Sequence, residues 1–125
     1  MKKTVLIVED NELNMKLFND LLEAHGYATL KTSHGIEAME LARAHKPDLI
    51  LMDIQLPGMS GVEALALLRA DPRTAAIPVM AVTASVTTKD VGVMAKAGFD
   101  GYVAKPIRYA AFMDAVRSHL EKASP

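Results

Sequence analysis

Polar residues that could bind a cation and move a phosphoryl group follow four of the apolar runs in this sequence. VLIV is followed by Glu9 and Asp10, LILM by Asp53, VMAV by Thr83 and YVA by Lys105. Oxygen ligands without cysteine favour a hard dication such as Mg²⁺ over zinc. Bound Mg²⁺ keeps open positions for phosphoryl oxygens, so the pattern predicts a magnesium-dependent phosphate site.

Each of these side chains has an expected chemical role. Asp53 is a candidate nucleophile that forms an aspartyl phosphate, and it needs no general base because a carboxylate is ionised at neutral pH. Lys105 would supply a charge and Thr83 a hydroxyl to phosphoryl oxygens. A single acid at a strand end is more often a turn former or helix cap. The recurrence at four successive run ends favours function.

The elements that position these residues follow from apolar periodicity. Apolar runs, most without alternation, predict strands covered on both faces, at 4–8, 27–31, 48–52, 78–82 and 101–104. Segments with helical spacing separate them. The alternation predicts an α/β fold: a doubly wound, five-stranded parallel sheet, flavodoxin-like (βα)5, with strand order 2-1-3-4-5. Strands one and three are neighbours in this order, so Glu9, Asp10 and Asp53 should converge at the carboxyl edge.

Helix boundaries are marked by capping residues. Gly26 and Gly98 stand where helix C-terminal caps are expected, and the last helix should end near Lys122. Thr87 and Asp90 resemble a capping pair at the start of the fourth helix. The residues that follow them, VGV, are poor helix formers. We therefore expect the fourth helix to be the most easily remodelled.

Composition limits the classes of function. Fourteen Lys and Arg against fifteen Asp and Glu give a net charge of -1, so no global field favours nucleic acid or an anionic membrane. The absence of cysteine excludes disulfides, thiol nucleophiles and thiolate metal sites. The N-terminus MKKTVLIVED is too short an apolar stretch for a signal peptide or membrane span. We expect one cytoplasmic domain over 1–125, without an output domain.

The ordered motifs resemble those of a known family. VLIVEDN, LILMDIQLPGMSG, VMAVTAS and GYVAKPI are similar to the response-regulator receiver domain of two-component signalling, over nearly the whole chain. The run KKTVLIVEDNELNMKLFNDLLEAHGY is most similar to DivK-type single-domain regulators, which are associated with bacterial cell-cycle and division control; the second half of the chain is less similar.

The resemblance implies roles for the acidic residues and their partners. Asp53 would accept a phosphoryl group from a phosphohistidine on a sensor histidine kinase or phosphotransfer protein. Asp10 and Asp53 would bind Mg²⁺ directly, with the main-chain carbonyl of Gln55 as a further ligand and Glu9 acting through water. Gln55 and Ser85 match positions that tune phosphoryl lifetime in the family, and neither is an acid.

The resemblance also implies a switch. Thr83 and Lys105 would contact the phosphoryl group, and Tyr102 would turn inward as Thr83 moves. The less favoured alternative is that Tyr102 is a half-buried residue of the last strand. The Lys105-Pro106 bond resembles the family's cis peptide, although from sequence alone cis is found in only a few per cent of X-Pro bonds.

The partner surface implied by the resemblance comprises the fourth helix, the fifth strand and the fifth helix. It would bind a downstream protein target, with the chain a monomer or weak dimer. Its candidate residues are apolar and could equally serve helix packing: Val91, Met94, Tyr102, Tyr109 and Met113.

Other functions fit the same fold. A phosphohydrolase with an aspartate nucleophile, of the haloacid-dehalogenase type, needs a second acid two residues after Asp53, where this chain has Gln55, and it needs a cap domain. A flavodoxin-like FMN carrier needs a hydroxyl- and Gly-rich phosphate loop after the first strand, where Glu9 and Asp10 would repel phosphate, and the chain has no Trp. The favoured interpretation is a switch whose chemistry is limited to its own phosphorylation and dephosphorylation.

Overall fold

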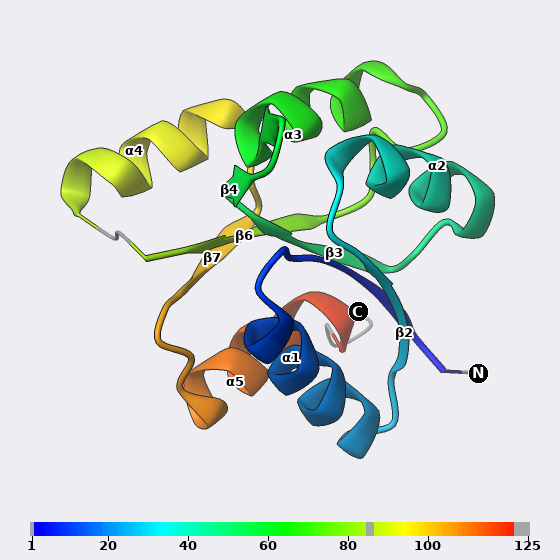
Figure 1. Ribbon diagram of the computed structural model, residues 1–125, viewed down its shortest axis with the longest axis vertical. Helices are drawn as coiled ribbons and strands as arrows, with labels where there is room; N and C mark the ends of the chain where they lie inside the picture. Colours follow the sequence, from blue (N-terminus) through cyan, green and yellow to red (C-terminus); the bar gives the residue numbers. More distant parts are fainter. Residues whose placement is uncertain (1, 85–86, 122–125) are drawn as a thin grey trace.

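A computed structural model describes residues 2–84 and 87–121. Its main sheet is parallel and has the order β2-β1-β3-β6-β7 (Figure 1). This confirms the predicted flavodoxin-like order, and the strand bounds agree with the predicted runs to within one residue. The strands are β1 (Thr4–Val8), β2 (Ala28–Thr32), β3 (Leu49–Asp53), β6 (Val79–Thr83) and β7 (Gly101–Ala104).

Five helices in the described part of the chain cover both faces of the sheet. Helices α1 and α5 lie on one face, and α2, α3 and α4 lie on the other (Figure 1). The last helix ends two residues before the predicted end. The helices are α1 (Glu12–Ala24), α2 (Gly35–His45), α3 (Gly61–Ala70), α4 (Thr88–Ala97) and α5 (Tyr109–Leu120).

The strand residues divide between two apolar cores. Leu6 and Ile50 pack with α2, α3 and α4, whereas Ile7 and Leu51 pack with α1 and α5. All four side chains are fully buried. Because successive side chains point to opposite faces and both faces are covered, the strands have no alternation of apolar and polar residues. The sheet edge is thereby held between two packed layers.

Local capping agrees with the sequence at several helix ends. The Thr87 side chain accepts a hydrogen bond from Asp90 N at 3.2 Å, and Gly98 has φ +103° at the end of α4. Gly26 has φ +86° after α1. These conformations satisfy end groups that a helix leaves unpaired. The capping pair and both glycine caps are therefore confirmed.

A short antiparallel hairpin between β3 and α3 was not predicted. It pairs β4 (Gln55–Leu56) with β5 (Met59–Ser60), and Gly58 turns between them with φ +74°. Gly61 then approaches the end of β3 so closely that a Cβ there would lie 2.5 Å from Asp53 O. Gly61 N also donates to Ile54 O at 2.7 Å. The hairpin thus packs directly against the strand end that carries Asp53.

Candidate functional site

The neighbouring strands β1 and β3 bring three carboxylates together. Val8 is in register with Met52, so Glu9, directly after β1, and Asp53, the last residue of β3, meet at the carboxyl edge. One oxygen from each of Glu9, Asp10 and Asp53 lies within 4.8 Å of the others. Glu9 and Asp53 are buried, at 2% and 4% exposure, whereas Asp10 is exposed. The predicted convergence of these three acids is observed.

Among the described residues, Lys105 is the one whose ammonium group lies beside this acidic cluster. It follows β7, and its Nζ lies 3.0 Å from Asp53 Oδ2 and 3.4 Å from the Glu9 carboxylate. Lys105 N donates to Thr83 O at 2.8 Å, which places the end of β6 beside it. The Lys105-Pro106 peptide is cis, as the resemblance implied. Three carboxylates therefore face one lysine.

Burial and the neighbouring Asp53 change the proton affinity of Glu9. Burial raises the pKa of Glu9 to about 7, and a hydrogen bond with Asp53 contributes in the same direction. Asn11 N donates to Glu9 Oε2 at 3.2 Å and opposes the rise. Desolvation lowers the pKa of Lys105, but Asp53 and Glu9 together outweigh it and the net direction is upward. Lys105 therefore remains charged, while Glu9 is only partly ionised near neutral pH in the absence of another cation.

The acidic cluster fits a hard dication. Glu9 Oε1 is buried and makes no hydrogen bond within residues 2–84 and 87–121, although Lys105 Nζ lies 3.4 Å away. Asp53 Oδ1 accepts from Gln55 N at 2.9 Å and Oδ2 faces Lys105, so the two oxygens of Asp53 have different partners. Carboxylate oxygens in negative excess are the ligand type of Mg²⁺. The residues present could hold such an ion.

Comparison with known proteins identifies the fold family. The model of the response regulator receiver domain matches residues 5–117. The chain belongs to this receiver family. It is 52% identical over 120 residues to proteins named polar-differentiation response regulator DivK from Brucella anthropi and Brucella ovis, covering 96% of this chain and 98% of each relative. The family is one of signalling switches in two-component systems.

Solved structures agree with this assignment. The receiver domain of a sensor histidine kinase from Pseudomonas aeruginosa has TM-score 0.88 and 30% identity, over 98% of this chain and 100% of that one, and carries a magnesium ion in its active-site cleft. The chemotaxis protein CheY4 of Vibrio cholerae has TM-score 0.89 over 95% of this chain and 99% of that one. Its 21% identity supports the fold alone.

The predicted partner surface needs correction. Met94 and Met113 are 6% and 0% exposed and belong to the two cores, so helix packing explains both. Val91 is half-buried against the core beside Met94. Tyr102 and Tyr109 are exposed, and the Tyr109 hydroxyl lies 3.0 Å from His25 Nε2. The orientation of α4, β7 and α5 in the packed fold, which apolar composition does not report, separates these two groups.

Some site features were absent from the sequence prediction. The backbone contact of Asn11 N to Glu9 and the close approach of Gly61 to Asp53 both order the acidic cluster. Gly61, directly before an apolar helical run, was the available signal for a close backbone approach. Ser85 lies outside the described residues. In the described part of the chain, the helices are too short or too polar to cross a membrane.

Proposed function

We propose that this protein is a single-domain phosphorylation switch that receives a phosphoryl group on Asp53. The observation that carries the proposal is the 3.0 Å contact between Lys105 Nζ and Asp53 Oδ2, next to two further carboxylates. An ammonium and a cation site on either side of one buried carboxylate match the charge of an incoming phosphoryl group. The donor would be a phosphohistidine of a sensor histidine kinase or a phosphotransfer protein.

In this mechanism Asp10, Asp53 and the Gln55 carbonyl would hold Mg²⁺, and Glu9 would act through water. The ion neutralises charge on the phosphoryl oxygens when bound. An Asp53 carboxylate oxygen forms the new bond to phosphorus while the bond from phosphorus to the histidine nitrogen of the donor breaks. The electron pair of that bond returns to the imidazole. Lys105 and the hydroxyl of Thr83 bind the phosphoryl oxygens.

The output follows from the added charge. Phosphorylation places further negative charge and three acceptor oxygens beside Thr83 and Lys105, by analogy with phosphorylated hydroxyl residues. Thr83 moves toward the phosphoryl group and Tyr102, 42% exposed here, turns inward. The surface of α4, β7 and α5 then changes its affinity for a downstream protein target. Similarity to DivK proteins supports a role in cytoplasmic cell-cycle or division signalling.

Phosphorylation with a small donor tests the assignment of Asp53. Incubation with Mg²⁺ and acetyl phosphate should give one acid-stable, base-labile adduct, detected by mass spectrometry and mapped to Asp53. Asp53→Ala should give none. Asp114→Ala, which removes an exposed carboxylate of α5, should accept phosphate normally. An equal adduct on the Asp53→Ala variant would contradict the assignment.

The switch role needs a separate experiment. Lys105→Ala should still accept phosphate but transmit poorly, because Asp53 retains its nucleophilic oxygen while the ammonium that reads the phosphoryl group is lost. Pull-downs of phosphorylated and unmodified protein would identify phosphorylation-dependent partners, and the phosphorylated variant is then compared with them. Normal partner binding by phosphorylated Lys105→Ala would refute the role of this lysine.

The two alternative functions make different predictions. A phosphohydrolase would turn over phosphomonoesters repeatedly, whereas a switch retains one phosphoryl group per chain. An FMN carrier would be purified as a yellow protein. Three carboxylates at the strand ends repel the phosphate of FMN and favour the switch.

A further inference from the structure

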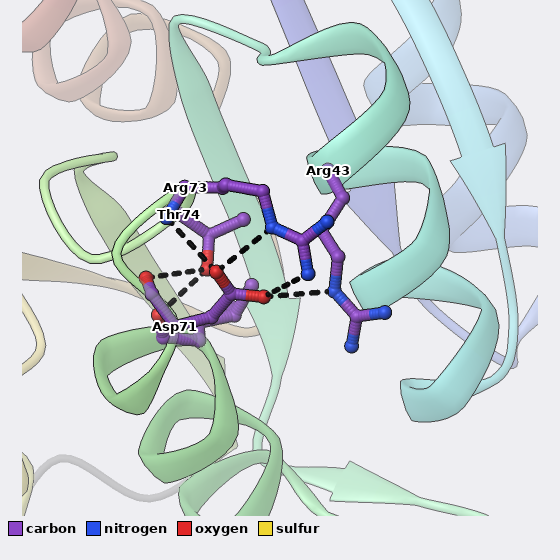
Figure 2. Close-up of polar contacts among 5 residues, drawn as sticks. Arg43, Asp71, Arg73 and Thr74 are labelled. Carbon is purple, nitrogen blue, oxygen red and sulfur yellow. Dashed lines mark hydrogen bonds and ion pairs between the residues drawn. The ribbon is translucent and has the colours of Figure 1, made fainter.

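A second charged cluster lies at the opposite end of the sheet, between the end of α3 and the start of β6. Asp71 follows α3, and its carboxylate accepts from Arg73 N at 2.9 Å, Arg73 Nε at 3.1 Å and Arg73 Nη2 at 3.0 Å. Arg43, from α2, places its Nε 3.0 Å from Asp71 Oδ2 (Figure 2). Two guanidinium groups therefore converge on one carboxylate.

The loop that carries this cluster is held firmly. Asp71 O accepts from Thr74 N at 3.0 Å and from Ala75 N at 2.8 Å. The fully buried Thr74 donates its hydroxyl to Leu68 O at 2.7 Å (Figure 2). Arg73 lowers the pKa of Asp71 through its side-chain hydrogen bond, so the carboxylate stays ionised. Asp71 thus fixes the orientation of the Arg73 fork before any ligand arrives.

The two arginines retain donors that the cluster does not use. Within the described residues, neither terminal nitrogen of Arg43 makes a hydrogen bond, and Arg73 Nη1 makes none. Arg69, two residues before Asp71, contrasts with them by donating to three carbonyls and a carboxylate. Two positive charges against one negative charge leave the cluster cationic. It therefore has both charge and hydrogen bonds to offer an anion.

An apolar groove adjoins these donors. The cavity, about 410 Å³, is lined by both arginines and, on its apolar side, by Met39, Leu67, Ala70 and Pro72. Leu67 is 42% exposed, so the groove presents apolar surface to solvent. Nucleic acid, a strong polyanion, would meet an apolar floor and a chain of net charge -1. The combination favours a carboxylate with an apolar side chain beside it.

We propose that the groove between α2 and the end of α3 is a docking site for a partner-protein segment that presents a carboxylate next to an apolar residue. Arg43 and Arg73 bind the carboxylate through their free donors, and the apolar neighbour covers the exposed Leu67, with the buried Met39 beneath it. Asp71 is a positioning residue. The site lies at the amino end of the sheet, away from Asp53, and so provides a contact that does not depend on phosphorylation.

A minimal probe tests this site without knowledge of the partner. N-acetyl-leucine carries a carboxylate beside an apolar side chain, and N-acetyl-leucinamide is its uncharged match. NMR of the whole ¹⁵N-labelled chain follows the Nε–H signals of Arg43 and Arg73 during titration. Saturable shifts of both signals with a Kd on the order of millimolar are expected for so small a ligand. The amide and acetate should bind at least about tenfold more weakly, because each lacks one of the two contacts.

Substitutions locate the binding. Arg43→Gln and Arg73→Gln should each weaken N-acetyl-leucine about tenfold or more, since each removes a charged donor. Arg117→Gln removes an arginine from another exposed ion pair, with Asp114, and should have no effect. Asp53→Ala should also have no effect, which separates this site from the proposed phosphorylation.

Three results would overturn the proposal. The first is the absence of saturation at concentrations about tenfold above the millimolar range. The second is a response to acetate equal to that to N-acetyl-leucine, which would show that the arginines bind a simple counterion and that the groove contributes nothing. The third is a tighter response to inorganic phosphate than to N-acetyl-leucine, which indicates a polyanion such as nucleic acid. Phosphorylation of Asp53 can succeed or fail independently of all three.

Discussion

The network around Arg69, at the amino ends of the strands, satisfies its charged groups with hydrogen bonds, whereas at the carboxyl ends three carboxylates face one lysine. Arg69 of α3 donates to Ala75 O, Ile77 O and Gly98 O, at 3.1, 2.6 and 3.1 Å, and to Asp100 Oδ2 at 2.8 Å. Asp100 Oδ2 also accepts from Val79 N at 2.8 Å. This network connects α3, β6 and the turn after α4.

The difference separates stability from function. A satisfied hydrogen-bond network lowers the energy of one conformation, and an unbalanced cluster raises it until a ligand neutralises the excess charge. The Arg69 network therefore should tolerate no substitution without loss of stability. The acidic cluster should tolerate removal of a carboxylate with loss of ligand binding but without loss of stability.

The largest expected effect is from Asp53→Asn. This variant should lose the acetyl-phosphate adduct completely, because the nucleophilic carboxylate is gone. Its melting temperature without metal should equal or exceed that of the unmodified protein, because one of three mutually repelling carboxylates becomes neutral. Mass spectrometry and thermal unfolding measure the two effects. A marked drop in melting temperature would show that Asp53 stabilises the fold.

The next effect is from Arg69→Ala, which should lower the stability of the protein without affecting its phosphorylation. Loss of hydrogen bonds to three carbonyls and one carboxylate should lower the free energy of unfolding by about 2–4 kcal/mol. Urea unfolding gives this value, and the yield of phosphorylated Asp53 at a temperature where both proteins are folded should not change. Arg117→Ala, in an exposed pair, should cost less than about 1 kcal/mol. Equal losses of unfolding free energy in Arg69→Ala and Arg117→Ala would contradict the stabilising role of the Arg69 network.

A smaller effect is expected from metal alone. Mg²⁺ should raise the stability of the protein by about 1.4 kcal/mol at ten times its Kd, because it binds the folded acidic cluster and not the unfolded chain. Differential scanning fluorimetry with and without Mg²⁺ measures the shift. Asp10→Asn should lose most of it. An unchanged melting temperature at saturating Mg²⁺ would argue against the cluster as a cation site.

The last prediction concerns the dependence of stability on pH. Burial raises the pKa of Glu9 to about 7 in the folded protein, above its ordinary value of 4.5. The folded state therefore holds this proton more tightly than the unfolded chain, and without metal the stability should fall as pH rises between these two values. Glu9→Gln should flatten this slope in urea unfolding curves recorded at a series of pH values. An unchanged slope would assign the dependence to another group.

The sequence by itself determined the alternation of strands and helices, the strand order and the meeting of Glu9, Asp10 and Asp53. These follow from local information: apolar runs predict buried parallel strands, and the carboxyl ends of such strands share one edge. Capping by Thr87 and Gly98 could likewise be predicted, because caps depend on residues close in the sequence. The 3.0 Å approach of Lys105 to Asp53 needed the structure for its geometry.

Tertiary structure decided what depends on the rotation of helices and on contacts between distant side chains. It placed Met94 and Met113 in the cores while leaving Tyr102 exposed, although all three are apolar enough for either location. It also joined Arg69 to Asp100 and Arg43 to Asp71. In sequence these are ordinary charged residues on polar segments, since no periodicity records which partner a long side chain will reach. The packing of α2 and α3 against the sheet determines both pairs.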